Sequence, residues 1–116
     1  MAPVRRIGQI VHLKPEAVAA YKECHAKVWP EVLKQIEDCN IRDYSIFFDN
    51  DRTLFARFDY IGEDFDADME KMRANPKVRE WWAMTDSMQE SLIPGAVGSA
   101  EGPGWWKPLE EVFYTD

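Results

Sequence analysis

The stretch from Ile41 to Tyr60, IRDYSIFFDNDRTLFARFDY, decides the fold class of this chain. Side chains alternate between two faces over residues 41–49 and again over residues 53–60, which is the period of a β-strand. Asp49-Asn50-Asp51-Arg52, between the two halves, has the residue types of a tight turn. The stretch therefore predicts a hairpin. In its first strand one face carries Tyr44, Ile46 and Phe48, and the other carries Asp43, Ser45 and Phe47.

The flanking sequence predicts further elements on both sides of this hairpin. Residues 5–13 alternate as a strand, and residues 16–40 repeat apolar side chains at helical steps of three and four. Pro30 lies inside that helical pattern and predicts a kink or break near residues 27–29. Beyond the hairpin we expect helices over residues 63–75 and 77 to about 92, a loop over 94–108, and a short strand over 109–114.

The resulting order, β-α-β-β-α-β, is that of a ferredoxin-like α+β fold, in which helices cover one face of an antiparallel sheet. The other face would be open in a single subunit. Because the predicted strands carry large apolar residues on both faces, we expect a second copy to cover the open one. The chain is therefore predicted to form a homodimer.

Length and charge limit the class of protein. The chain has 116 residues, which suits one domain over residues 1–116, and 14 Lys and Arg residues against 21 Asp and Glu residues give a net charge of −7. This acidic balance argues against nucleic acid or an anionic membrane as a partner. The sequence contains no apolar run long enough to span a membrane and no expected signal peptide. Since two cysteines cannot form a disulfide framework, we expect a cytoplasmic protein.

The helix before the hairpin holds the first candidate for chemistry. Tyr21, His25 and Trp29 are four residues apart and would share one helix face. An imidazole titrates near neutral pH and suits proton transfer, while the aromatic rings could stack on a small ring. On this spacing alone, a histidine packed at the edge of the core is the more frequent case. Cys24 adjoins His25, but neighbouring helical residues point apart, so a Cys–His pair is not expected.

Aromatic residues are unusually frequent, at 13% of the chain with five tryptophans. Trp81-Trp82 lies in a predicted helix, where one indole can pack inward while the other lines a cavity or an interface. Trp105-Trp106 lies in the predicted loop and has no assigned role, although long loops are frequently lids or partner contacts. Tyr44 could contact a ligand or belong to the core. His12, in the first strand, is expected to be a buried or interface residue. No spacing typical of a metal site is present.

Four blocks of sequence, in this order, resemble the L-rhamnose mutarotase family. They are Tyr21-x-x-x-His25-x-x-x-Trp29-Pro30-Glu31, Tyr44-Ser45-Ile46-Phe47-Phe48-Asp49, Trp81-Trp82 with Met84-Thr85-Asp86-x-Met88, and Leu109-Glu110-Glu111-Val112-Phe113-Tyr114. Each block alone is weakly specific, but the combination, which spans residues 5–114, is strongly specific. It reverses the balance for His25 in favour of catalysis.

The resemblance implies a dimeric α+β barrel that interconverts the α and β anomers of L-rhamnose without metal or cofactor. By the same resemblance, the acid catalyst is His25 and the substrate contacts are Tyr21, Tyr44, Trp81 and Trp82. Mutarotation needs a proton removed from the anomeric hydroxyl and a proton delivered to the ring oxygen. The base stays open among Tyr21, Tyr44, Asp43 and water.

The chain also departs from the bacterial pattern of that family. Ala26 and Phe47 replace commoner Asn or Asp and Tyr, and one residue is absent between Trp82 and Met84. The longer segment 94–108 resembles the eukaryotic, especially fungal, branch. These differences keep L-fucose or another 6-deoxy or L-configured aldose open as the substrate. Two other functions stay open: another enzyme of dimeric α+β barrel type, such as a cofactor-free oxygenase or a cyclase, and a non-catalytic sugar-binding module.

Overall fold

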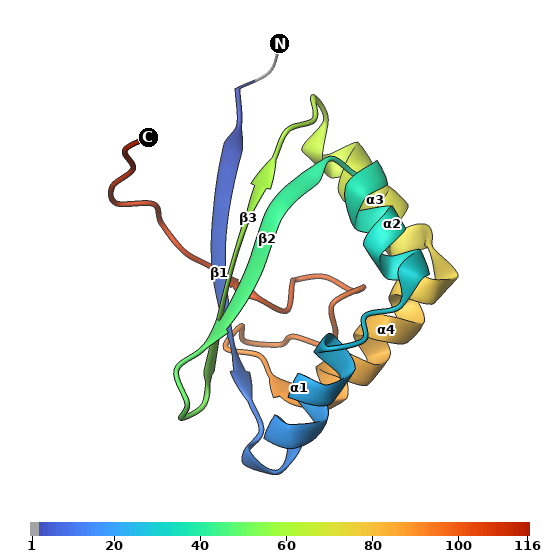
Figure 1. Ribbon diagram of the computed structural model, residues 1–116, viewed down its shortest axis with the longest axis vertical. Coiled ribbons are helices and arrows are strands. Elements are labelled where there is room, and N and C mark those ends of the chain that lie inside the picture. Colours follow the sequence, from blue (N-terminus) through green and yellow to red (C-terminus); the bar gives the residue numbers. More distant parts are fainter. Residues whose placement is uncertain (1–2) are drawn as a thin grey trace.

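The ferredoxin-like α+β fold is confirmed by the computed structural model, which describes residues 3–116 (Figure 1). Its strands are β1 (Arg5–Leu13), β2 (Ile41–Phe48), β3 (Thr53–Tyr60), β4 (Gln89–Glu90) and β5 (Lys107–Pro108). The sheet order is β2-β3-β1-β4, β5 also pairs with β1, and every pairing is antiparallel. The helices lie on one side of this curved sheet, which forms half of a barrel (Figure 1).

The helical segment before the hairpin is broken, as Pro30 predicts. It consists of a 3-10 turn η1 (Pro15–Ala17), α1 (Val18–His25) and α2 (Pro30–Asp38). Trp29 has extended backbone angles, φ −60° and ψ 135°, because the proline ring that follows excludes the helical region. The chain therefore changes direction directly after His25, which leaves this side chain at the end of a helix.

The second helical pair follows the hairpin closely. α3 spans Phe65–Ala74 and α4 spans Pro76–Ser87. Side-chain caps fix both starts: Asp64 accepts a hydrogen bond from the amide of Ala67, and Asn75 accepts from the amides of Lys77 and Val78. The asparagine also separates the two helices, so the predicted helix over 63–75 and the one that follows it are both observed.

A β-bulge in β2 controls which side chains face the helices. Arg42 pairs with Asp59 and Ser45 with Arg57, so two residues, Asp43 and Tyr44, stand opposite one. Asp43 adopts φ 52°, a left-handed conformation that aspartate tolerates. Because the bulge inserts one extra residue, Tyr44 lies on the same inner face as Ile41. From Tyr44 to the end of the strand, the side chains alternate between the two faces as predicted.

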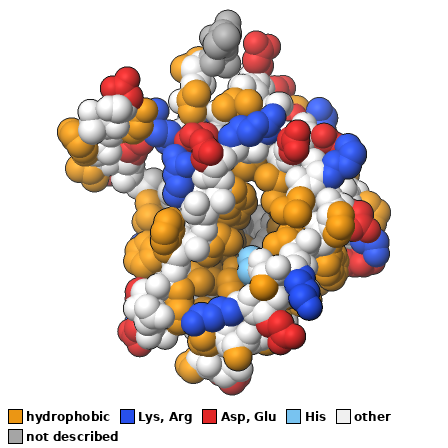
Figure 2. Space-filling model, viewed as in Figure 1, with side chains coloured by type: hydrophobic (Ala, Val, Ile, Leu, Met, Phe, Trp, Pro, Cys, Tyr) orange, Lys and Arg blue, Asp and Glu red, His pale blue; other side chains and the backbone are white. Residues whose placement is uncertain are grey.

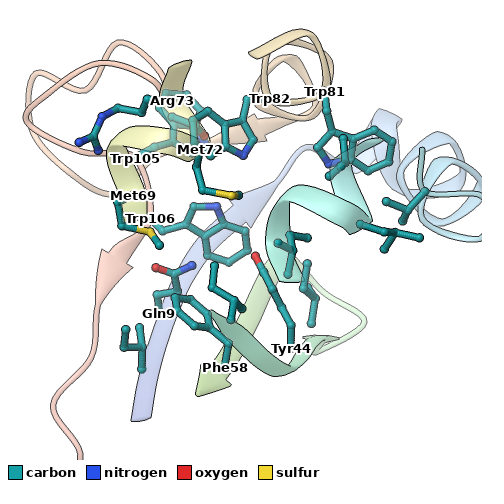
Figure 3. A pocket seen from close by; sticks show the side chains of 18 of the residues that line it. Gln9, Tyr44, Phe58, Met69, Met72, Arg73, Trp81, Trp82, Trp105 and Trp106 are labelled. Atoms are coloured by element: carbon teal, nitrogen blue, oxygen red, sulfur yellow. The ribbon is translucent and has the colours of Figure 1, made fainter. Parts of the chain in front are cut away.

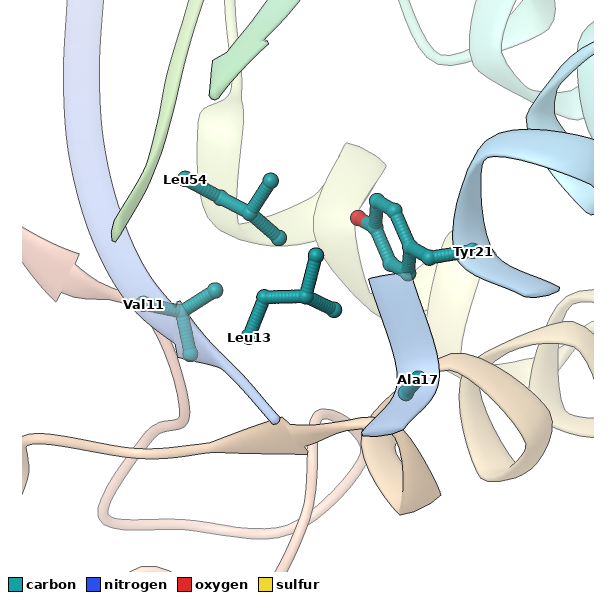
Figure 4. Close-up of a cluster of buried hydrophobic side chains, with 5 residues drawn as sticks. All are labelled: Val11, Leu13, Ala17, Tyr21 and Leu54. Carbon is teal, nitrogen blue, oxygen red and sulfur yellow. The ribbon is translucent and has the colours of Figure 1, made fainter. Parts of the chain in front are cut away.

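The main core lies where β1 and β3 meet α1. Five buried side chains gather there, namely Val11, Leu13, Ala17, Tyr21 and Leu54 (Figure 4). Val11 and Leu54 are direct partners across the two strands, which fixes the register of the sheet from its inner face. Tyr21 reaches this cluster from α1. A second cluster of Cys39, Met72 and Val78 joins the helices.

The C-terminal third differs from the prediction in two places. The helix predicted to reach about residue 92 ends at Ser87, because β4 follows at once and pairs with His12 and Leu13. The predicted strand over residues 109–114 is wrong. Pairing covers only Lys107–Pro108, and after the amide of Leu109 donates to the carbonyl of Gly8 the chain leaves the sheet. Side-chain contacts with Arg6 then replace backbone pairing, through the Glu111 carboxylate and the Tyr114 ring.

The face of the sheet opposite the helices carries an exposed apolar row. Phe47 pairs with Phe55, and Phe55 pairs with Ile10, so these three side chains stand side by side across three strands. Phe47 is 62% exposed and Phe55 42% exposed. Within residues 3–116, no helix combines the length and the apolar character that crossing a membrane requires.

Candidate functional site

A cavity of about 710 Å³ lies between the inner face of the sheet and α2, α3 and α4. It opens as a hollow bordered largely by hydrophobic side chains (Figure 2). Its volume is within the usual range for small-molecule sites. Apart from the tryptophan indoles, the described lining has few polar side chains, namely those of Gln9, His25, Tyr44, Arg73 and Ser99. The cavity therefore offers apolar walls with a small number of hydrogen-bonding positions.

His25 contributes the only imidazole of the described lining. Its Nδ1 lies 2.9 Å from the main-chain oxygen of Tyr21, and since a carbonyl can only accept, Nδ1 carries the proton in the neutral ring. This tautomer leaves Nε2 unprotonated and available to a ligand. Burial lowers the pKa of His25 below its usual 6.5, although the hydrogen bond to the Tyr21 carbonyl opposes this effect. The ring is therefore mainly neutral at pH 7.

Cys24 lies closer to His25 than the helical geometry predicts. The thiol is 3.3 Å from Nδ1 of His25, because both side chains turn back to the carbonyl of Tyr21 at the end of α1. The expectation that the two side chains point apart is wrong. Burial nevertheless raises the pKa of the Cys24 thiol, so it stays protonated at neutral pH and is no thiolate nucleophile.

Tyr21 supports His25 from behind. The two rings stack with a centroid distance of 4.2 Å and an interplanar angle of 29°. Tyr21 is only 5% exposed, and its hydroxyl accepts a hydrogen bond from Nε2 of the buried Gln89 at 3.1 Å. It does not line the large cavity; it lines a neighbouring pocket of about 410 Å³, which His25 also borders. Burial raises the pKa of Tyr21 far above its usual value of 10.

Tyr44 faces the cavity because of the bulge in β2. Its hydroxyl points into the cavity, and its ring packs against Phe58 at a centroid distance of 5.3 Å (Figure 3). Loss of water around this hydroxyl raises the pKa of Tyr44 to about 12, so it is a neutral hydrogen-bonding group at pH 7. Asp43 does not line the cavity; its main-chain oxygen accepts a hydrogen bond from Arg57.

Trp81 and Trp82 reach the cavity from successive positions of α4 (Figure 3). Trp81 is 6% exposed and meets the His25 ring edge-on at a centroid distance of 5.2 Å. Its ring centroid is also 5.2 Å from that of Trp29, so Trp81 contacts both His25 at the end of α1 and Trp29, which the break before Pro30 removes from that helix. Trp82 is half-buried against the second core cluster. The expected division, one indole packed inward and one more open, is observed.

Residues 91–106, which we call the strap, connect β4 to β5 and contribute Ser99, Gly104, Trp105 and Trp106 to the cavity lining. One contact joins the two ends of the strap, and three groups of contacts hold it against the rest of the fold. The Ser91 hydroxyl donates to the carbonyl of Trp105, and Ser99 donates from both its amide and its hydroxyl to Asp86. Glu101 forms an ion pair with Arg79. Nε1 of Trp105 donates to Oε1 of Gln89 at 2.8 Å.

Gln89 therefore connects the strap to the residues around His25. Its amide nitrogen donates to the Tyr21 hydroxyl, while its amide oxygen accepts from the Trp105 indole. Both bonds are buried from solvent on the Gln89 side, since this residue is 3% exposed. A buried amide with both ends paired fixes two aromatic rings in a single arrangement.

The structure brings His25, Tyr44, Trp81 and Trp82 together in one cavity and places Tyr21 directly behind His25. Sequence reasoning missed Gln9 and Gln89, and it singled out Trp106 without assigning it a role. The sequence could have indicated Gln9, because the alternation of β1 places this polar residue on the inner face of the sheet. It gave no such indication for Gln89, since this residue was assigned to a helix. Among residues 3–116, no cluster of three His, Cys, Asp or Glu side chains is placed to hold a metal ion.

Comparison with known proteins agrees with this geometry. A family model described as L-rhamnose mutarotase matches residues 6–115. An L-rhamnose mutarotase from Phocaeicola vulgatus is 38% identical over 106 residues, which cover 90% of this chain and 91% of that protein. Another from Formosa agariphila is 36% identical over 99 residues, covering 84% of this chain and 85% of the relative.

A solved structure has the same fold. The crystal structure of an L-rhamnose mutarotase from Formosa agariphila superposes with a TM-score of 0.73 at 29% sequence identity. The superposition covers 97% of this chain and 99% of that one, so the two structures correspond over their whole length.

Proposed function

This chain belongs to the L-rhamnose mutarotase family and is an isomerase that interconverts the α and β anomers of L-rhamnose, and we propose that His25 is its catalytic acid–base residue. One observation supports this assignment above the others. Of the ionisable side chains in the described lining, His25, Tyr44 and Arg73, only His25 titrates near neutral pH. Arg73 is paired with Glu70.

Ring opening requires two proton transfers, at the two oxygen atoms that are bonded to C1 of the sugar. The anomeric hydroxyl loses its proton, the bond between C1 and the ring oxygen breaks, and that oxygen gains a proton. Neutral His25, with Nε2 unprotonated, can take the proton from the anomeric hydroxyl and return it to the ring oxygen, since both oxygens are bonded to C1. Rotation about the C1–C2 bond and reversal of these steps yields the other anomer.

The other residues proposed for the site suit binding rather than proton transfer. Tyr44, neutral at pH 7, would hydrogen-bond a sugar hydroxyl, and Trp81 and Trp82 would pack on the apolar C–H surface of the ring. Tyr21 remains a proposed substrate contact through the smaller pocket. Its stacking on His25 also supports a role in holding the imidazole. Its buried hydroxyl, with a raised pKa, is poorly suited to act as the base.

Exchange spectroscopy tests this function directly. Saturation-transfer NMR on equilibrated L-rhamnose should show anomer exchange well above the buffer rate. His25→Ala should lower the catalysed rate by about 10²–10⁴-fold, the usual contribution of a positioned acid or base. His12→Ala is the matched control, because His12 lies in β1 outside the cavity and should leave the rate unchanged. Wild-type exchange at the buffer rate would overturn the function; undiminished exchange in His25→Ala, with an unchanged melting curve, would overturn only the assigned role.

We also propose that the chain acts as a homodimer of single-domain subunits in the cytoplasm. The row of Phe47, Phe55 and Ile10 supports a second copy on the open sheet face, since large exposed apolar patches are uncommon on monomers. The free thiols of Cys24 and Cys39 support a reducing compartment. The neutral sugar is a suitable partner for a chain of net charge −7, whereas nucleic acid and anionic membranes are not.

A further inference from the structure

Both tryptophans of the strap line the cavity, and the strand pairing explains the direction of Trp106. In the antiparallel pairing of β5 with β1, Lys107 is opposite Ile10 and Pro108 is opposite Gln9. Ile10 belongs to the outer face and Gln9 to the inner face, so the alternation directs Trp106 inward, like Pro108. Gly104, at φ 131°, makes the turn that precedes the pair.

Trp106 stands among side chains from three other elements. Its indole lies between Met69 and Met72 of α3 on one side and Gln9 and Phe58 of the sheet on the other (Figure 3). The contacts that anchor the strap, described above, hold this indole in position. The indole therefore adds an aromatic surface that comes from the strap to the tryptophans that α4 contributes to the same cavity.

Gln9 adds a polar group to this otherwise apolar surface. Its carboxamide lies beside Trp106 and lines the cavity (Figure 3). Within residues 3–116, no hydrogen bond to its side chain is formed, while Gln89 and Gln35 both have protein partners. A half-buried amide with unused hydrogen-bonding capacity, facing a cavity, is suited to a ligand hydroxyl.

We propose that Trp106 and Gln9 form a specificity wall that selects 6-deoxy sugars, Trp106 by packing on the C6 methyl group and Gln9 by hydrogen-bonding a ring hydroxyl. This inference rests on the proposed function, since it assumes that the sugar occupies this cavity. The wall consists of one indole, two thioether side chains and one amide. A 6-deoxy aldose carries complementary groups, namely a methyl group for the apolar side chains and neighbouring hydroxyls for the amide. Charged groups would have no matching partner here, because Arg73 is already paired with Glu70.

Three sugars that have the same configuration at C2, C3 and C4 separate the contribution of the C6 methyl group from that of the ring hydroxyls. L-Rhamnose carries the C6 methyl group, L-mannose carries a hydroxyl at C6, and L-lyxose lacks C6. We expect the wild type to prefer L-rhamnose in kcat/KM over both L-lyxose and L-mannose by about 10-fold or more, the discrimination that an apolar pocket allows for one carbon or one hydroxyl group. Trp106→Ala should reduce both preferences to within about threefold, mainly through KM, and Trp106→Phe should retain part of them.

Gln9→Leu, of similar volume, should lower kcat/KM for all three sugars by up to about tenfold, the effect of one hydrogen bond. The preference among them should be unchanged. Val97→Ala is the control in the same segment, because Val97 is 69% exposed and outside the cavity lining. Melting curves of all variants verify that they fold, and Trp106→Phe keeps the test valid if Trp106→Ala does not.

Sugar affinities from calorimetry, measured beside the exchange rates, separate this inference from the proposed function. Wild-type exchange with the same sugar preference in Trp106→Ala and Trp106→Phe would overturn the inference alone. Binding that depends on Trp106 without any exchange would overturn the function and support the wall. Neither binding nor exchange in the wild type would overturn both.

Discussion

The phenol ring of Tyr21 stacks on the imidazole of His25, with ring centroids 4.2 Å apart. The main-chain oxygen of the same tyrosine binds Nδ1 of that imidazole at 2.9 Å. One residue thus fixes both the ring plane and the tautomer of the proposed catalyst. Such an outer partner commonly sets the orientation of a functional histidine, and here the residue that fills this role is also part of the hydrophobic core.

Tyr21→Phe tests whether this tyrosine acts through structure or through its hydroxyl. The substitution keeps the stack and the carbonyl but leaves the buried amide of Gln89 without an acceptor. We expect the free energy of unfolding to fall by about 1–3 kcal/mol, the cost of one unsatisfied buried donor, as measured by urea denaturation. Exchange should fall less than tenfold. A loss comparable to that of His25→Ala would instead identify the hydroxyl as a direct participant.

The pH dependence of exchange follows from the protonation of His25. Because burial lowers its pKa, the neutral form dominates at pH 7 and is lost as the pH falls through a value below 6.5. A mechanism that begins with unprotonated Nε2 therefore predicts a flat rate around neutrality and a decline on the acid side. NMR exchange rates, corrected for buffer catalysis, measure this pH dependence between about pH 4.5 and 8, the range in which histidines in proteins usually titrate. A rate that rises on acidification would show that His25 begins the reaction protonated.

Charges on the outer face of the sheet should separate the proposed dimer. Phe47→Glu with Phe55→Glu places two like charges in the exposed apolar row, where burial against a second copy would be costly. Sedimentation should show the wild type as a dimer at micromolar concentration and the double variant as a monomer. Phe113→Glu, at a more exposed aromatic position outside that row, is the control. A monomeric wild type would contradict the proposal.

The central strands could be predicted because local and tertiary signals agree there. Side chains of Leu54, Ala56 and Phe58 alternate in the sequence and are buried on one face in the structure. The break after His25 was equally readable, since Pro30 cannot continue a helix that begins before it. Spacing alone placed Tyr21 beside His25, whereas Trp81 was proposed for the same site through the family resemblance, because spacing does not bring α4 against α1.

The end of the chain could not be predicted from periodicity, because its structure is set by distant partners. Residues 109–114 include the β-branched and aromatic residues typical of a strand, yet Arg6 binds the Glu111 side chain and the Tyr114 ring instead of extending the ladder. Gln89 follows a helical pattern but pairs with Leu13 of β1. The bulge at Asp43 leaves no clear trace in the sequence either, since it depends on the register with β3.

The pairing of β5 with β1 has a consequence for how ligand binding affects stability. The wall of the cavity that holds Trp106 exists only while β5 is paired with β1, a contact of high sequence separation. The complete cavity is therefore a property of the folded chain alone. A sugar that binds only this complete cavity would shift the folding equilibrium toward the native state by mass action. The substrate would therefore raise the free energy of unfolding of its own enzyme.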